Sequence, residues 1–142
     1  MLILEKTTAC ADETEIVGAE LAEYVVDNSI EFVALFGDLG AGKTAFVRGF
    51  ASVIAPEAPV CSPTYAIVNE YDGKIPLFHF DMYRIEDEDA LDSIGFWDYF
   101  GRGIIITEWS ENIPYALPEA YLRVEIKKCG ETTRKIIAEV IS

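Results

Sequence analysis

The sequence predicts an α/β domain built around a mixed, partly parallel β-sheet. Residues 32–36 (FVALF) are apolar at every position, which is typical of a central strand covered on both faces. A glycine-rich turn follows this strand, and then a helix is expected from about Lys43 to Ile54, ending before Pro56. Two predicted hairpins occupy much of the second half. Strands that alternate with helices and then form hairpins favour a sheet with both parallel and antiparallel pairs.

The N-terminal region predicts one strand and one helix. Residues 2–4 (LIL) are expected to form a short edge strand. Asp12, with Glu15 three residues later, is a helix-start signature, and the helix should run to about Asn28. One face of this helix is apolar at a spacing of one turn. The residues of that face are Val17, Leu21 and Val25.

The middle of the chain carries a strong hairpin signal. Residues 64–71 (TYAIVNEY) and 75–80 (IPLFHF) are strand-like and flank Asp72-Gly73. Residues 86–94 predict a short acidic helix, and residues 96–100 (FWDYF) an aromatic clasp over the core.

The C-terminal region predicts three more strands. Residues 103–107 (GIIIT) read as another buried strand, and residues 121–127 and 133–141 as a second hairpin around Gly130. We find no internal repeat, low-complexity stretch or linker. A single domain is therefore expected over residues 1–142.

Composition limits the class of protein. Hydrophobic residues make up 51% of the 142 residues and charged residues 25%, an ordinary globular balance. No apolar run approaches the roughly 18 residues that a membrane helix needs. The start of the chain lacks the basic residues of a secretory signal, and the three cysteines have no metal-ligand spacing. We expect a soluble, cytoplasmic protein without a membrane partner.

The chain is strongly acidic, with a formal net charge of −14. Binding to nucleic acid needs clustered lysines and arginines, and only 11 basic residues are spread along the chain. Direct binding of nucleic acid is therefore not expected. An acidic surface suits a basic protein partner, although solubility explains it too. The free protein is expected to be a monomer.

Residues 37–44 (GDLGAGKT) fit the phosphate-loop pattern G-x-x-x-x-G-K-[ST] at every fixed position, between a buried strand and a helix. Glycines let the backbone turn tightly and aim its N–H groups inward, where the helix N-terminus adds positive potential. The lysine would reach the β- and γ-phosphates of ATP, and the threonine hydroxyl would bind Mg²⁺. This predicts a three-layer α/β/α domain like that of P-loop NTPases. The loop residues are Gly37, Asp38, Leu39, Gly40, Ala41, Gly42, Lys43 and Thr44.

A phosphate loop needs a carboxylate at the end of a neighbouring strand. Asp81 ends the run IPLFHFD and Glu108 ends the run GIIITE, so both should emerge at the carboxyl edge of the sheet. The alternative for either one alone is a strand-end carboxylate that faces water, and the sequence leaves open which of them dominates metal binding.

Three further features have a functional and an ordinary reading. Ser62-Pro63-Thr64 is either a nucleotide-sensing switch or a turn that starts a strand. His79, the only histidine, is read as a packed or hydrogen-bonded structural residue rather than a catalytic base. Trp109 either belongs to the core or fixes the direction of the Glu108 carboxylate. The acidic residues of segment 86–92 form either a solvated face or a surface for a partner.

With these motifs identified, the chain resembles the bacterial TsaE (YjeE) family over nearly its whole length. These small ATPases are needed to make threonylcarbamoyladenosine at position 37 of tRNA. The motifs occur in the family's order and spacing. They are GDLGAGKT, Arg48-Gly49-Phe50, Ser62-Pro63-Thr64-Tyr65, HFDMYR at 79–84 and Glu108-Trp109.

The resemblance implies roles for these residues. Lys43 and the loop amides would bind phosphates, and Thr44 and Glu108 would be the Mg²⁺ ligands. Asp81 would lie near the γ-phosphate or the waters of the metal, and Thr64 would belong to the switch. Thr14 and Arg134 match positions near the adenine end of the nucleotide. Ala45, grouped with the nucleotide-binding residues, and Met82 replace a threonine and a leucine that are common in the family.

The family works on the TsaD–TsaB pair, and its ATP cycle supports turnover or resetting of that complex. No arginine is an obvious finger and no glutamine is placed to orient water, so hydrolysis should be weak alone and faster with the partner. A small-molecule kinase is a rival reading, but the chain has little room for a lid. A GTPase is another, but the guanine-reading N-K-x-D motif is absent. A third is a binding switch whose hydrolysis is incidental.

Overall fold

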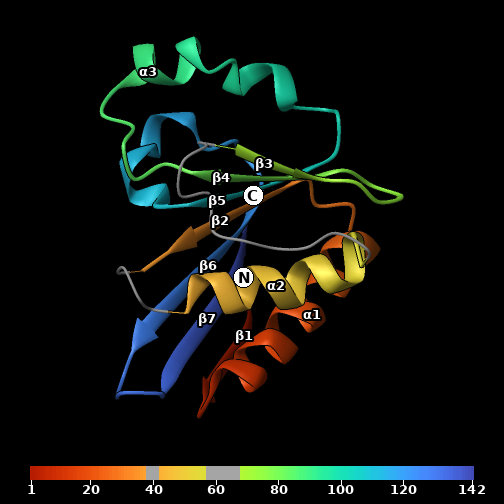
Figure 1. Ribbon diagram of the computed structural model, residues 1–142, viewed down its shortest axis with the longest axis vertical. Helices are drawn as coiled ribbons and strands as arrows, with labels where there is room; N and C mark the ends of the chain where they lie inside the picture. Colours follow the sequence, from red (N-terminus) through yellow and green to blue (C-terminus); the bar gives the residue numbers. More distant parts are fainter. Residues whose placement is uncertain (38–41, 57–67) are drawn as a thin grey trace.

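The computed structural model describes residues 1–37, 42–56 and 68–142, which form a seven-stranded sheet with helices on both faces (Figure 1). The strands are β1 (Leu2–Thr8), β2 (Phe32–Phe36), β3 (Val68–Tyr71), β4 (Leu77–Asp81), β5 (Ile104–Glu108), β6 (Tyr121–Lys128) and β7 (Arg134–Ile141). The α-helices are α1 (Ala11–Asp27), α2 (Lys43–Ile54) and α3 (Glu88–Ser93), and the short 3₁₀ helices are η1 (Phe96–Tyr99), η2 (Ser110–Asn112) and η3 (Pro114–Ala116).

The sheet is mixed, with the strand order β1-β7-β6-β2-β5-β4-β3. Its centre is parallel: β2 pairs with β6 on one side and β5 on the other, and β4 pairs in parallel with β5. The outer pairs are antiparallel: β3 with β4, β6 with β7, and β1 with β7. Because β2, β4 and β5 run in the same direction, their carboxyl ends share one edge of the sheet.

The molecule has three layers, as predicted. In Figure 1, α1 and α2 lie together on one side of the sheet, and α3 lies on the other. Two separate groups of buried side chains fill the spaces between these layers, one on each face of the sheet. The apolar run of β2 contributes to both, which explains why all five of its residues are apolar.

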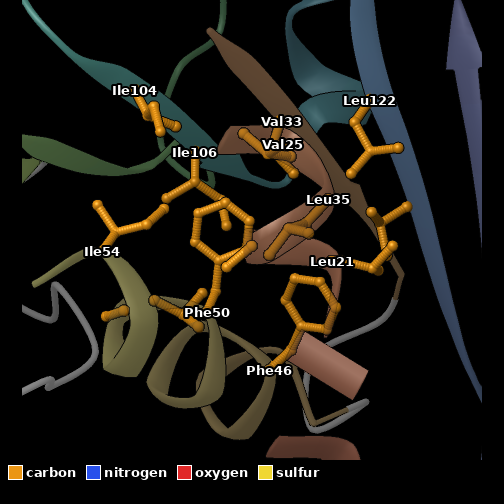
Figure 2. Close-up of a cluster of buried hydrophobic side chains, with 14 of the residues drawn as sticks. Leu21, Val25, Val33, Leu35, Phe46, Phe50, Ile54, Ile104, Ile106 and Leu122 are labelled. Carbon is orange, nitrogen blue, oxygen red and sulfur yellow. The ribbon is translucent and has the colours of Figure 1, made fainter. Parts of the chain in front are cut away.

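The core under α1 and α2 combines aliphatic side chains of the sheet and both helices with two aromatic rings from α2. Figure 2 shows Phe46 and Phe50 extending from α2 toward Leu35 and Ile106 of the sheet. Both phenylalanines are fully buried. This packing fixes α2, and with it the end of the glycine-rich loop, against the centre of the sheet.

The two long helices meet backbone to backbone. A Cβ atom at Gly18 of α1 would lie 2.2 Å from the carbonyl oxygen of Phe46, and one at Gly49 of α2 would lie 1.8 Å from that of Glu15. Glycine is therefore required at both positions for the observed separation of the helices. Beside this crossing, Arg48 and Glu15 form an ion pair of 2.8 Å.

The predicted elements are present, with changes at their ends. The strand predicted at residues 2–4 extends to Thr8, because β1 pairs with β7 along its length. The helix predicted from Asp12 to about Asn28 is confirmed within one residue at each end, but Asp12 does not cap it. Cys10 is the residue that precedes α1, and Glu13 accepts the backbone N–H of Ala9 at 2.9 Å.

The second half follows the prediction closely. β3 and β4 form the expected antiparallel hairpin, but β4 begins at Leu77, and residues 64–67 of the predicted strand lie outside the described residues. The acidic helix is shorter than predicted and covers Glu88–Ser93. The predicted aromatic clasp is η1, where the rings of Phe96 and Tyr99 pack edge-on against Phe80. Within residues 1–37, 42–56 and 68–142, no helix is long and apolar enough to span a membrane.

Candidate functional site

The glycine-rich segment connects β2 to α2 at the carboxyl edge of the sheet. Gly37 follows β2 directly, and Gly42 precedes α2 with a left-handed φ of 92°, a conformation that glycine adopts without strain. The predicted loop residues Asp38, Leu39, Gly40 and Ala41 lie outside the described residues. The described ends of the loop therefore match the predicted strand–loop–helix arrangement.

Lys43 is the first residue of α2 and is only 5% exposed. Its Nζ donates a hydrogen bond to the carbonyl oxygen of Gly37 at 2.9 Å and lies 4.4 Å from the ring centroid of Trp109. The first turn of α2 carries no acidic side chain, so the positive end of the helix dipole adds to the lysine charge. An anion would be stabilised at this helix start.

The two predicted carboxylates end neighbouring strands. In the parallel pairing of β4 and β5, Asp81 lies opposite Glu108, which confirms that both emerge at the same edge of the sheet. Their surroundings differ. Glu108 is 6% exposed, whereas Asp81 is partly exposed and accepts the backbone N–H of Tyr83 at 3.0 Å. Of the two, Glu108 is the carboxylate held in the interior.

His79 binds Glu108 directly. Its Nε2 is hydrogen-bonded to Oε2 of Glu108, and its Nδ1 lies 3.3 Å from the hydroxyl of Tyr71. The prediction that His79 is a packed, hydrogen-bonded residue agrees with its complete burial. Its partners could not be predicted, because they depend on the register of three strands.

A network of backbone contacts fixes the ends of β4 and β5. The backbone N–H of Met82 donates to the carbonyl oxygen of Glu108 at 3.0 Å, and Asn112 donates from its side chain to the carbonyl of Met82 at 2.9 Å. Between them, Trp109 adopts a left-handed φ of 58°. The buried hydroxyls of Thr107 and Ser110 lie 2.7 Å apart across this turn. The direction in which Glu108 and Trp109 leave the strand is therefore set by hydrogen bonds on both sides.

Arg134 lies close to the start of α2, and Thr14 is connected to the strand beside it. The hydroxyls of Thr14 and Thr8 are 2.8 Å apart, and Thr8 is the register partner of Arg134 between β1 and β7. The side chain of Arg134 passes within 3.7 Å of the position that a Cβ would take at Gly42. The structure thus brings Arg134 to the helix end of the loop, whereas Thr14 contacts Thr8 on the neighbouring strand.

One contact at the other end of the loop was not predicted. The backbone N–H of Gly37 donates to the Glu111 carboxylate at 3.0 Å. Glu111 belongs to η2, which follows the turn at Trp109. No sequence signal pointed to Glu111, since it lies three residues past the strand in a segment without a pattern.

The donor groups fit a magnesium nucleotide. Mg²⁺ prefers oxygen ligands, and the hydroxyl of Thr44 on α2 and the carboxylates of Asp81 and Glu108 supply oxygens at one edge of the sheet. Lys43 supplies positive charge for phosphates. In the described parts of the chain, no three His, Cys, Asp or Glu side chains group into a metal site. Ala45 is buried in α2, and Thr64 lies outside the described residues.

A mixed α/β/α sheet whose central strand leads through a glycine-rich loop into a helix, with a buried lysine at the helix start, defines the P-loop NTPase-like class of folds. The family model described as "Threonylcarbamoyl adenosine biosynthesis protein TsaE" matches residues 8–136. The chain therefore belongs to the TsaE family, whose members take part in the biosynthesis of threonylcarbamoyladenosine in tRNA.

Individual relatives support the same family assignment. The chain is 38% identical to the TsaE protein of Bacillus subtilis over 135 residues, which cover 94% of this chain and 83% of the relative. It is 43% identical to the TsaE protein of Haemophilus influenzae over 115 residues, covering 77% and 72%. The crystal structure of Bacillus subtilis YdiB superposes with a TM-score of 0.75 at 31% identity, covering 100% of this chain and 88% of that one.

Proposed function

We propose that this TsaE-family protein is an ATPase that binds ATP with Mg²⁺ at the β2–α2 loop and acts on a TsaD–TsaB heterodimer during threonylcarbamoyladenosine synthesis. The observation that carries the proposal is the joint position of Lys43 and Glu108. They come from α2 and β5, and the lysine ammonium lies over the ring of Trp109, the residue next to Glu108. A phosphate-binding cation and a carboxylate therefore share one edge of the sheet.

In this proposal, Lys43 and the N-terminal amides of α2 bind the phosphates, and Gly42 allows the backbone to approach them closely. Thr44 and Glu108 would hold the metal, and Asp81 would lie near its waters. Bound Mg²⁺ would neutralise charge that develops on the phosphate oxygens. Lys43 releases the Gly37 carbonyl when it turns to a phosphate, because an ammonium stabilises a phosphate more strongly than a carbonyl.

The partner is proposed from the family and from charge. The relatives are named as threonylcarbamoyladenosine biosynthesis proteins, and a net charge of −14 favours a protein partner over direct binding of tRNA. The cytoplasm is the expected place for such a tRNA-modifying activity. Intrinsic hydrolysis should be slow, because the sequence has no glutamine to orient water and none of its arginines is an obvious finger.

The test is steady-state ATP hydrolysis with and without TsaD–TsaB, together with repeated modification of tRNA. We expect hydrolysis to rise on addition of the partner and modification to continue over many turnovers, with Lys43→Ala inactive in both. Phosphorylated product with a small-molecule acceptor would favour a kinase instead. A non-hydrolysable ATP analogue that sustained repeated modification would favour a binding switch. No change in hydrolysis on adding the partner would count against the proposal.

A further inference from the structure

His79 is a buried polar side chain in an apolar strand. It has no exposed surface and stands between Phe78 and Phe80, both of which are also buried. An imidazole in such surroundings costs free energy unless its nitrogens have hydrogen-bond partners. Here both nitrogens have one, Tyr71 at Nδ1 and Glu108 at Nε2. Strand packing alone would be satisfied by another apolar residue, so these two contacts are what the histidine contributes.

The three side chains form a row across neighbouring strands. Tyr71, His79 and Glu108 lie on β3, β4 and β5. Each contact is diagonal, since the register places Tyr71 opposite Leu77 and His79 opposite Ile106, two residues before the contacted residue. Tyr71, Leu77 and Ile106 belong to the core beneath α1 and α2. The row therefore lies on the face that α2 covers and ends at the carboxyl edge of β5.

The row fixes the orientation of the Glu108 carboxylate. An ionised carboxylate only accepts hydrogen bonds, so His79 donates from Nε2, and in a neutral ring Nδ1 then accepts from the Tyr71 hydroxyl. Asp81 is held differently, by the backbone N–H of Tyr83 in its own turn. Of the two strand-end carboxylates, only Glu108 is oriented from the interior of the protein.

We propose that Tyr71 and His79 are positioning residues for Glu108: the hydrogen-bonded row holds one carboxylate oxygen and leaves the other for the magnesium ion of the nucleotide complex. The inference rests on the proposed function, because it assigns a task at the same site. Outer partners of metal ligands act in this way in proteins generally, by setting ligand orientation. The row also explains why β4 carries a histidine between two buried phenylalanines, two residues before Asp81.

Three substitutions separate the contributions of His79 and Tyr71 to the positioning of Glu108. His79→Phe keeps an aromatic ring but removes both nitrogens. His79→Gln retains an N–H donor near the position of Nε2. Tyr71→Phe removes only the hydroxyl. The readouts are the Mg²⁺ concentration for half-maximal binding of a non-hydrolysable ATP analogue, Mn²⁺ binding followed by electron paramagnetic resonance, and binding of the analogue in EDTA.

We expect His79→Phe to raise the metal requirement by about 10- to 100-fold, the range typical of lost outer partners of metal ligands. Tyr71→Phe should raise it by a smaller factor, and His79→Gln should restore part of the loss. Binding of the analogue in EDTA should stay within about twofold of the wild type, because Lys43 and the loop are unchanged. If His79→Phe does not fold, Tyr71→Phe and His79→Gln carry the comparison.

Phe78→Leu is the matched control, since Phe78 is the buried neighbour of His79 on the opposite face of β4. It should lower the melting temperature through a cavity but leave the metal requirement unchanged. A folded His79→Phe protein with the wild-type metal requirement would overturn the inference, and so would an equal shift in Phe78→Leu. A wild-type protein that binds no ATP analogue at any metal concentration would instead overturn the proposed function, and the inference with it.

Discussion

The ammonium of Lys43 lies 4.4 Å from the ring centroid of Trp109, the residue that follows Glu108. Trp109 holds a left-handed φ of 58°, which a bulky residue adopts only when its surroundings enforce it. The lysine at the start of α2 therefore contacts the residue that directly follows the carboxylate at the end of β5. This link makes Trp109 a reporter for the state of the loop.

We predict that ATP binding changes the fluorescence of Trp109, because Lys43 leaves the ring when it turns to a phosphate. The measurement uses a Trp97→Phe protein, in which Trp109 is the only tryptophan. Trp97 is 40% exposed on η1, so its replacement should leave the fold intact. Adding Lys43→Ala should abolish the change. ATP binding seen by calorimetry without any change in emission would contradict this prediction.

Lys43→Ala should weaken ATP binding by at least about 100-fold, since it removes a charge-assisted contact to phosphate at a site of low exposure. Isothermal titration with ATP measures the effect. Arg102→Ala is the matched control, because Arg102 is a cation that packs on Phe78 and Tyr99. ATP affinity unchanged by Lys43→Ala would disprove the assignment of the loop.

The two strand-end carboxylates should respond unequally to neutralisation. Glu108→Gln removes the charge of the carboxylate that His79 orients. In Asp81→Asn, the side-chain oxygen can still accept the hydrogen bond from the backbone N–H of Tyr83. We expect a larger increase in the Mg²⁺ requirement for Glu108→Gln, and for Asp81→Asn a loss of hydrolysis with smaller loss of metal binding. Titration of Mg²⁺ at fixed nucleotide separates the two. Equal shifts would mean that both carboxylates bind the metal directly.

Arg134→Ala should lower nucleotide affinity while the fold is kept. Arg134 lies beside Gly42 at the end of an outer strand pair, and its guanidinium binds the carbonyls of Gly130 and Thr133 in the adjacent turn. A comparison of ATP and GTP affinities tests whether this side chain lies at the base end: a selective loss for ATP is expected. An equal loss for both nucleotides would place Arg134 at the phosphates instead.

Gly49→Ala should destabilise the fold by about 2–4 kcal/mol, because its Cβ would lie 1.8 Å from the Glu15 carbonyl and the helices must separate. Gly130→Ala is the control, since a Cβ there would meet only Thr133 at an ordinary 3.5 Å. Denaturant unfolding measures both free energies. A Gly49→Ala protein as stable as the control would show that the helices can move apart at little cost.

Local patterns were sufficient to predict most elements of the fold. The apolar run of β2, the loop ending at Lys43 and the turn at Asp72-Gly73 each carry a short-range signal that tertiary structure does not override. The start of α1 was predicted within one residue, but its N-cap was missed because Cys10 is not a usual capping residue. Its first turn is instead stabilised by Glu13, which binds the backbone before the helix.

The sequence predicted which residues lie at the candidate site but not how their side chains are arranged. Strand ends at Asp81 and Glu108 follow from two apolar runs, but their alignment depends on the register of β4 and β5, which packing across the whole sheet determines. The row of Tyr71, His79 and Glu108 depends on two registers, that of β3 with β4 and that of β4 with β5. Glu111 was missed because its partner, the N–H of Gly37, is 74 residues away in the chain.

The close crossing at Gly18 and Gly49 limits how a signal can leave the nucleotide site. Because the helices touch through backbone atoms, we expect α2 to keep its place along its axis against α1 when a nucleotide occupies the loop. Trp109 and the hydrogen bonds of Asn112 connect the start of α2 sideways to the end of β4. We therefore expect the effect of a bound nucleotide to leave the site across the sheet edge and not along the helix.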